Sequence, residues 1–188
     1  LGTLPTAVDY LLNYPYGCVE QTTSRLFPLL IAKSYPDIYG STLKDRNLEA
    51  MIKTGLTRLR NLQSSDGGWS WWYGPSSPYV TAYVTEMLSL AKAQGYSLDE
   101  QMMSSLKSYL LSKSTNQTYD QQILRLYGQS LLGIQQNKSL VVYEGNQADI
   151  SALIIMHNLR NGHTNPQTNG LDRLLTLAQP EGDSLFWP

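Results

Sequence analysis

Small and apolar residues recur at helical spacing along almost the whole of this 188-residue chain. Spacings of i, i+3, i+4, i+7 and i+8 place such residues on one face of a helix. Two segments follow the pattern clearly: Leu48, Met51, Ile52, Gly55, Leu56, Leu59, and then Val80, Tyr83, Val84, Met87, Leu88, Ala91. Strand-like alternation is nearly absent, and residues 140–143 are the one short candidate. The sequence therefore predicts an all-α fold.

Start and stop signals mark several of the expected helices. Ser77 is a typical N-cap, Pro78 suits the first helical position, and Gly95 is a stop signal. Residues 97–100 read as a capping box that opens the next helix. Further helices are expected at 4–12, 20–33, 123–131, 150–157 and 171–178. Their short connections favour antiparallel neighbours, so we expect seven to nine helices arranged as hairpins.

Composition limits the class of protein. A 41% hydrophobic and 15% charged content is typical of a soluble globular protein. The formal net charge is −1 and the 14 basic residues are scattered, so nucleic acid is not an expected partner. The apolar runs are too short for a membrane span, and no direct membrane contact is expected. No linker divides the chain, so residues 1–188 are predicted to form a single, truncated domain, with both ends cut from a longer polypeptide.

Cysteine and histidine usage argues against a metal site. The single cysteine, Cys18, excludes a cluster built on several thiolates. His157 and His163 lie six residues apart with no carboxylate at ligand spacing between them. We therefore expect a buried histidine and a loop histidine, with no metal and no cofactor.

Two aromatic turns suggest a repeated helical-hairpin plan. Residues 62–72 and 177–187 each end a helix, turn at glycine and carry large aromatic side chains. We expect their tryptophans to be structural core. A ligand platform for a sugar or an isoprenoid is the alternative reading.

Cys18 and Gln21 are the pair with the most distinctive chemistry. Residues three apart in the first turn of a helix lie on one face, with Cβ atoms roughly 5–6 Å apart. If the Cys18 sulfur displaces ammonia from the Gln21 carboxamide, a strained internal thioester forms. Any nearby amine or hydroxyl can then take the acyl group and release the Cys18 thiol. Water competes, so such a bond needs a dry pocket.

The flanking residues suit this chemistry. A stiff aromatic approach precedes the cysteine: Tyr14, Pro15 and Tyr16. Gly17 lets the chain turn, Val19 is apolar, and Glu20 is an acid in the first turn, where the helix dipole favours it. Glu20 is interpreted as a surface carboxylate, and a role as proton acceptor for the incoming nucleophile is the alternative.

The octapeptide Tyr-Pro-Tyr-Gly-Cys-Val-Glu-Gln at 14–21 resembles the thioester motif of the α2-macroglobulin and complement family, Pro-x-Gly-Cys-x-Glu-Gln. Val19 resembles the bacterial members, where vertebrate proteins usually have glycine. Downstream, Asp66-Gly-Gly-Trp69 followed by Thr81-Ala-Tyr-Val84 is similar to the family's aromatic turn and next helix. The resemblance covers residues 1 to about 112, and from 113 to 180 only the helical rhythm continues.

This resemblance implies an α/α toroid of antiparallel helical hairpins, incomplete in this chain. It implies that Cys18 gives the thioester sulfur and Gln21 the acyl group, with residues 14–17, Val19 and Glu20 as framework. Family members are large protease traps, which implies a single-turnover covalent inhibitor rather than an enzyme. The implied partners are target proteases and shielding domains of the parent chain. The implied location is the bacterial periplasm or cell envelope.

An amine is the expected target. The histidine that redirects some complement members toward hydroxyls would fall beyond Pro188, and neither His157 nor His163 occupies its position.

Three other readings stay open at this point. One is an enzyme of transglutaminase or cysteine-protease type, with Cys18 as nucleophile and His157 as base. Another is a toroid-type terpenoid or glycan enzyme, although no Asp-x-Asp-Asp run or zinc-ligand set is present. The third is a purely structural toroid without an intact thioester.

Overall fold

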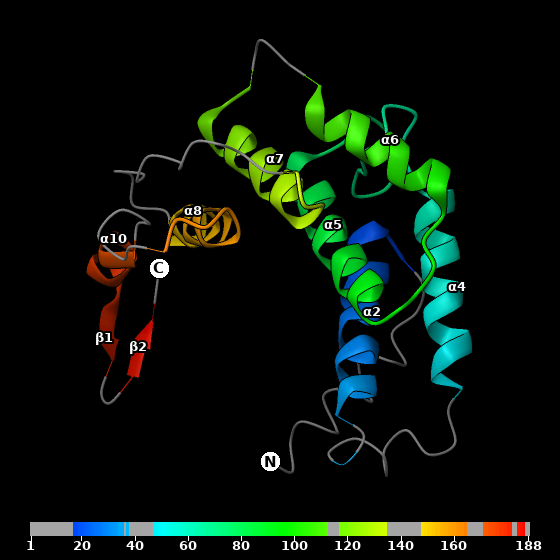
Figure 1. The fold of residues 1–188 in the computed structure, drawn as a ribbon, viewed down its shortest axis with the longest axis horizontal. Coiled ribbons are helices and arrows are strands. Elements are labelled where there is room, and N and C mark those ends of the chain that lie inside the picture. The colour runs from blue at the N-terminus through cyan, green and yellow to red at the C-terminus, as the bar shows by residue number, and fades with distance from the viewer. Residues whose placement is uncertain are drawn as a thin grey trace. The chain divides into compact units, whose positions relative to one another are not determined.

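The protein is described here by a computed structural model (Figure 1). It describes residues 17–35, 37, 47–112, 117–134, 148–164, 171–181 and 184–186. The chain forms two compact units, Leu1–Tyr109 and Leu110–Pro188. The single domain expected over 1–188 stays a prediction.

The first unit is built around helix α2 (Val19–Ser34), which packs against both α4 (Leu48–Asn61) and α5 (Pro78–Ala93). Gly55 of α4 makes the α2–α4 approach close, because a Cβ placed there would lie 2.6 Å from a methyl carbon of Leu26. Each fully buried aliphatic side chain contributes roughly 1.5–3 kcal/mol. The three helices share a core of such residues: Leu26, Leu29, Leu30, Ile52, Leu59, Val80, Val84, Met87 and Leu88.

The expected limits of α5 are confirmed. The Ser77 side chain accepts from the Val80 N–H, Pro78 is the first helical residue, and Gly95 follows the helix with a φ of +86°. The capping box expected at 97–100 is wrong in detail. Helix α6 (Glu100–Leu111) is capped by Asp99, whose Oδ1 accepts from the Met102 N–H at 2.8 Å. Asp99 also pairs with Arg60 of α4 at 3.1 Å, which holds it at this position.

The second unit contains α7 (Tyr119–Leu131), α8 (Ala148–Arg160) and α10 (Leu171–Leu177). Helix α8 packs against both α7 and α10, and a small apolar cluster of Ile123, Ile150 and Ile154 is buried there with Leu153 against it. These elements match the weaker helical patterns of the sequence.

The end of the chain differs from expectation. Where the sequence suggests an aromatic turn after a helix, strands β1 (Gln179–Glu181) and β2 (Ser184–Phe186) pair antiparallel, with Glu181 opposite Ser184. The two intervening residues are Gly-Asp, a pair typical of tight hairpin connections. The helix expected at 4–12 and the strand candidate at 140–143 lie outside the described residues. Among the helices that the structure describes, none is long and apolar enough to cross a membrane.

His157 is a buried structural residue, as the sequence predicts. Its side chain is fully shielded in α8, and its Nδ1 lies 3.1 Å from the Leu126 carbonyl of α7. The Asn161 amide donates to the His157 carbonyl at 2.8 Å. Burial lowers the pKa of His157 below its ordinary 6.5, the hydrogen bond to Leu126 opposes this, and the charge of His163 lowers it further. The neutral imidazole therefore joins α7 to α8.

This burial predicts a loss of stability in acid. Below pH 6.5 the unfolded chain protonates His157 while the folded chain resists it, so stability present above pH 6.5 falls as the pH drops toward the lower folded pKa. Urea unfolding at about pH 7.5 and about pH 5.5 measures the loss. His157→Gln should remove part of this pH dependence, and His163→Gln should keep most of it. Equal pH dependence in wild type and His157→Gln would contradict the assignment.

Candidate functional site

Cys18 and Gln21 meet at the start of α2. Cys18 is the N-cap residue, in extended backbone with φ −71° and ψ 177°, and its side chain is buried. The Gln21 Oε1 accepts from the Cys18 N–H at 3.0 Å, as in a capping box. The carboxamide is therefore folded back onto the residue that carries the thiol. The structure brings together the two residues that the sequence predicts as a reacting pair.

The same backbone arrangement occurs at the start of α7 without a thiol. There Thr118 is the N-cap, and the Gln121 Oε1 accepts from the Thr118 N–H at 3.2 Å. The Thr118 hydroxyl accepts from the Gln121 N–H at 3.3 Å. A glutamine at the third helical position thus reaches back to its cap by ordinary helix geometry. At the start of α2 the reactive group is supplied by a cysteine in place of threonine.

Gly17 provides the space for the Gln21 carboxamide. A Cβ at position 17 would lie 1.4 Å from the Gln21 Oε1 and 2.6 Å from its carbonyl carbon Cδ. The structure shows a requirement for volume at this position, because an added Cβ would overlap the carboxamide itself. Any side chain here would compete with the Gln21 carboxamide for one position.

Two long-range contacts hold the backbone of residues 17–19. The Arg58 Nη2 of α4 donates to the Gly17 carbonyl at 2.9 Å. The Val19 N–H donates to the Trp71 carbonyl at 3.0 Å. These contacts tie the first turn of α2 to α4 and to the loop at 62–77. Sequence reasoning missed both of them.

The sequence contains a signal for the Arg58 contact but none for the Trp71 contact. Positions 51, 55, 58 and 62 follow helical spacing, and Arg58 is the one charged residue on that small or apolar stripe. The contact from Trp71 uses its backbone carbonyl, which any residue carries.

The other expected framework residues divide into two groups. Tyr14, Pro15 and Tyr16 lie outside the described residues. Val19 is fully buried, and Glu20 accepts a 2.5 Å hydrogen bond from the Ser24 hydroxyl. Ser24 in turn lies 3.0 Å from the Tyr83 hydroxyl of α5, and burial of that phenol raises its pKa. Glu20 is thus linked through Ser24 to α5, which fits a framework role.

Trp69 anchors the loop that leads from α4 to α5. Its side chain is fully buried, and its indole N–H donates to the Leu59 carbonyl at 2.8 Å. Its backbone N–H donates to the Thr81 hydroxyl at 2.9 Å, and its carbonyl accepts from the Ser77 N–H at 2.8 Å. The aromatic turn and the Thr-Ala-Tyr-Val helix are therefore parts of one arrangement.

The two glycines before Trp69 are both required by close contacts. Gly67 has a φ of +93°, and a Cβ there would lie 2.2 Å from the Ser105 carbonyl oxygen. A Cβ on Gly68 would lie 2.7 Å from Ser76 and 2.8 Å from the Thr81 hydroxyl. Asp66 closes the turn by accepting from the Gly68 N–H at 3.1 Å. These contacts explain the Asp-Gly-Gly-Trp sequence residue by residue.

The expectation that the tryptophans are core is right for Trp69 and wrong for two others. Trp71 and Trp72 are 48% and 59% exposed. Trp71 stacks on Tyr79, with ring centroids 6.2 Å apart. The Trp69 carbonyl accepts from the Ser77 N–H, and between these two residues the side chains of Trp71, Trp72 and Tyr73 face outward. Trp187 lies outside the described residues.

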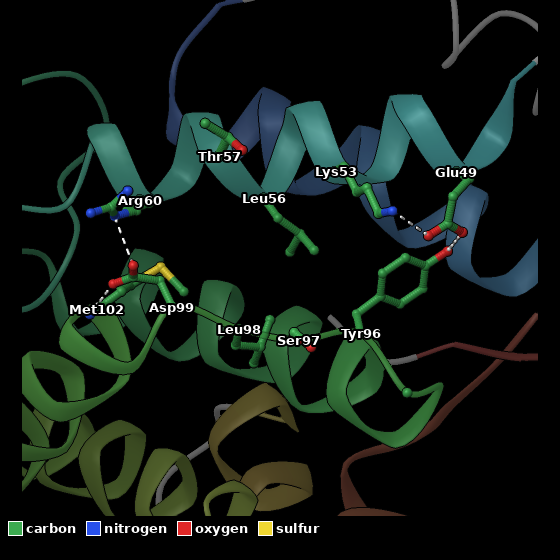
Figure 2. A pocket seen from close by; sticks show the side chains of 11 residues that line it. Glu49, Lys53, Leu56, Thr57, Arg60, Tyr96, Ser97, Leu98, Asp99 and Met102 are labelled. Carbon is green, nitrogen blue, oxygen red and sulfur yellow. Dashed lines mark hydrogen bonds and ion pairs between the residues drawn. The ribbon is translucent and has the colours of Figure 1, made fainter.

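A separate pocket of about 590 Å³ lies between α4 and the α5–α6 connection (Figure 2). Its charged side chains are matched: Arg60 pairs with Asp99 at 3.1 Å, and Lys53 pairs with Glu49 at 3.3 Å. The Tyr96 hydroxyl donates to Glu49 at 2.9 Å, and this bond lowers the Glu49 pKa. Neither Cys18 nor Gln21 lines the pocket, so it is distinct from the Cys18–Gln21 site.

The metal and Cys18–His157 readings concern residues that the structure partly describes. Among them, no three histidine, cysteine, aspartate or glutamate residues gather where they could hold a metal ion. The His157 ring is buried in the packing of α7 and α8, and its Nδ1 is used by Leu126. That environment suits a structural histidine rather than a base for Cys18.

Comparison with known proteins decides the family. The family described as the A-macroglobulin TED domain matches residues 1–143. The chain belongs to this family. Its bacterial relatives include the alpha-2-macroglobulin of Thermotoga maritima, 38% identical over 119 residues, and that of Escherichia coli K12, 38% identical over 97 residues. These matches cover 63% and 48% of this chain but only 7% and 6% of the relatives.

Solved structures share the fold. The native E. coli alpha-2-macroglobulin matches 97% of this chain and 13% of its own, with a TM-score of 0.72 and 19% identity. A Salmonella alpha-2-macroglobulin reacted with methylamine matches 96% of this chain and 13% of its own, with a TM-score of 0.70 and 22% identity. These matches confirm the expected fold class, the all-α arrangement of the TED region.

The Trp69 anchor predicts that Thr81 matters more than Thr85, although both are fully buried. Thr81→Val leaves the buried Trp69 N–H without its acceptor, which should cost about 1–3 kcal/mol of unfolding free energy. The Thr85 hydroxyl donates to the Thr81 carbonyl one turn earlier on the same helix, so Thr85→Val should cost about 1 kcal/mol or less. Urea unfolding compares them. Equal losses of unfolding free energy in the two variants would mean that the Thr81–Trp69 hydrogen bond contributes no more than the hydroxyl of an ordinary helical threonine.

The space at Gly17 predicts a local defect with little loss of stability. Gly17→Ala should displace the Gln21 carboxamide and free the Cys18 N–H, because the glutamine end can move. Loss of half a capping box costs about 1 kcal/mol or less. Amide hydrogen exchange at Cys18 should speed up while the melting temperature changes little. When Gly17→Ala is added to Gln21→Ala, exchange at the Cys18 amide should speed up no further. If the two substitutions had additive effects on this exchange, the steric explanation would be refuted.

Proposed function

We propose that this chain is the thioester domain of a protease-trapping protein of the alpha-2-macroglobulin type. In this proposal Cys18 and Gln21 form an internal thioester that acts once as an acyl donor. The observation that carries it is the Gln21 carboxamide, folded onto Cys18 with its oxygen 3.0 Å from the Cys18 nitrogen and seated in the space left by Gly17.

The bonds made and broken are simple. In formation, the Cys18 sulfur bonds to the Gln21 carbonyl carbon, the C–N bond breaks, and ammonia leaves with the thiol proton. In transfer, an amine attacks the same carbon, the C–S bond breaks, and the sulfur takes up a proton to become a thiol. The Gln21 Oε1 stays in the acyl group throughout. The Cys18 N–H can therefore hold this oxygen before, during and after the reaction.

The proposed target is a lysine amine of an attacking protease. Family membership and the alpha-2-macroglobulin names of the bacterial relatives support this target. The reaction of the Salmonella structure with methylamine supports an amine as nucleophile. Each thioester is consumed in one capture, so the chain acts as a covalent inhibitor and not as a catalyst.

The proposed setting is a larger protein in the bacterial periplasm or cell envelope. The chain spans less than a tenth of the curated relatives that it matches. Other domains are therefore proposed to shield the thioester from water. The exposed rings of Trp71 and Tyr79 suit such a covering, because the Trp71 carbonyl bonds directly to the first turn of α2.

Methylamine tests the acyl donor. The protein expressed from its complete reading frame should have an intact mass lower than its sequence by one ammonia. Treatment should then add one methylamine and release one titratable thiol. A mass equal to the sequence, with a Cys18 thiol that titrates from the start, would refute an intact thioester and favour a purely structural toroid.

Peptide mapping provides the matched controls. The adduct should lie on Gln21 and not on Gln121, which shares the capping geometry but faces a threonine. Cys18→Ser should abolish the adduct, while Gln121→Ala should leave it unchanged. Labelling of Gln21 without Cys18 would show that the carboxamide reacts by another route.

A further inference from the structure

One peptide group at the site is held at both of its ends. The carbonyl of the Gly17–Cys18 peptide accepts from the Arg58 Nη2 at 2.9 Å. The N–H of the same peptide donates to the Gln21 Oε1 at 3.0 Å. Arg58 therefore lies in line with the acyl group, with a single peptide plane between them.

A trans peptide is planar, so its C=O and N–H point in opposite directions. When Arg58 fixes the carbonyl, it also fixes the direction of the N–H. The guanidinium carries a permanent positive charge and draws electron density toward the carbonyl oxygen. Hydrogen bonds in such a chain strengthen one another, so the Cys18 N–H becomes a better donor.

That donor is placed where negative charge develops. When sulfur or an amine attacks the Gln21 carbonyl carbon, the charge moves to Oε1. A backbone N–H bonded to this oxygen stabilises the developing charge as an oxyanion-hole donor does, and before reaction the Cys18 N–H already bonds to Oε1 at 3.0 Å. The N-terminus of α2 adds the positive end of the helix dipole.

We propose that Arg58 is the positioning residue for acyl transfer at Gln21. It aims and polarises the Cys18 N–H at the carbonyl oxygen, in the formation of the thioester and in its aminolysis. This inference rests on the proposed function for its chemistry. The contact itself can be tested independently.

Arg60 provides a matched control on the same helix. Its Nε pairs with Asp99 at the separate pocket, and its side chain is 53% exposed (Figure 2). Arg60→Met removes a charge and an ion pair two residues from Arg58 without removing a contact to residue 17. Arg58→Met keeps an unbranched side chain as far as the position of the arginine Nε but removes the guanidinium donor. Arg58→Lys keeps the charge and a donor and should restore part of the effect.

The rate of thiol release by methylamine is the chemical measurement, made on the protein expressed from its complete reading frame. Losing a whole oxyanion donor costs about 10²–10³ in rate, so Arg58→Met should slow release at least roughly tenfold. Arg58→Lys should lie between Arg58→Met and wild type, and Arg60→Met should match wild type. An unchanged rate in Arg58→Met would overturn the inference.

Residue-resolved hydrogen exchange separates positioning from general unfolding. In Arg58→Met the Cys18 amide should exchange faster, while the Trp69 amide, held by Thr81, should stay as protected as in wild type. Equal loss of protection at both amides, or none at Cys18, would refute the positioning role. A wild type that never takes up methylamine would refute the proposed function alone, because the exchange measurement still tests the contact.

Discussion

The burial of Trp69 is the constraint on which the start of α2, where Cys18 and Gln21 meet, depends. Its indole N–H is satisfied by α4 and its backbone N–H by α5, so Trp69 anchors the loop to both helices. That position directs the Trp71 carbonyl at the Val19 N–H. Arg58 reaches the same turn from α4. The Cys18–Gln21 pair is thus placed by helices that contribute no reacting atom, and packing of the first unit defines the geometry of the site.

The chemistry itself needs little that is unusual. A cap residue and a glutamine three positions later form a capping box in both α2 and α7, with similar hydrogen-bond lengths. In α7 the pair Thr118 and Gln121 only stabilises the start of a helix. In α2 the cysteine turns the same arrangement into a thiol beside a carboxamide. The special features of the site are the missing side chain at Gly17, whose space the Gln21 carboxamide occupies, and the contacts that hold the backbone around it.

Local signals in the sequence were sufficient for the parts of the fold that local interactions decide. The limits of α5 followed from Ser77, Pro78 and Gly95, and the pairing of Cys18 with Gln21 followed from helical spacing. The contact from Trp71 could not be predicted, because it uses a backbone carbonyl of a distant loop. The outward orientation of Trp72 depends on how that loop is fastened, and hydrophobicity alone indicates burial. Arg58 is recognisable in the sequence as a charged residue on a stripe of small or apolar residues. The stripe does not show which atom the Arg58 side chain binds.

Gly17 separates the stability of the fold from the proposed acyl transfer, two properties that usually change together. Its missing side chain leaves room for the Gln21 carboxamide, the group proposed to react. The same absence contributes little to the packing of the helices. Selection for a folded, abundant protein would therefore accept many residues at this position. Selection for acyl transfer would accept almost none. A population of variants drifting under the first pressure alone would lose its reactivity here while every helix remained intact.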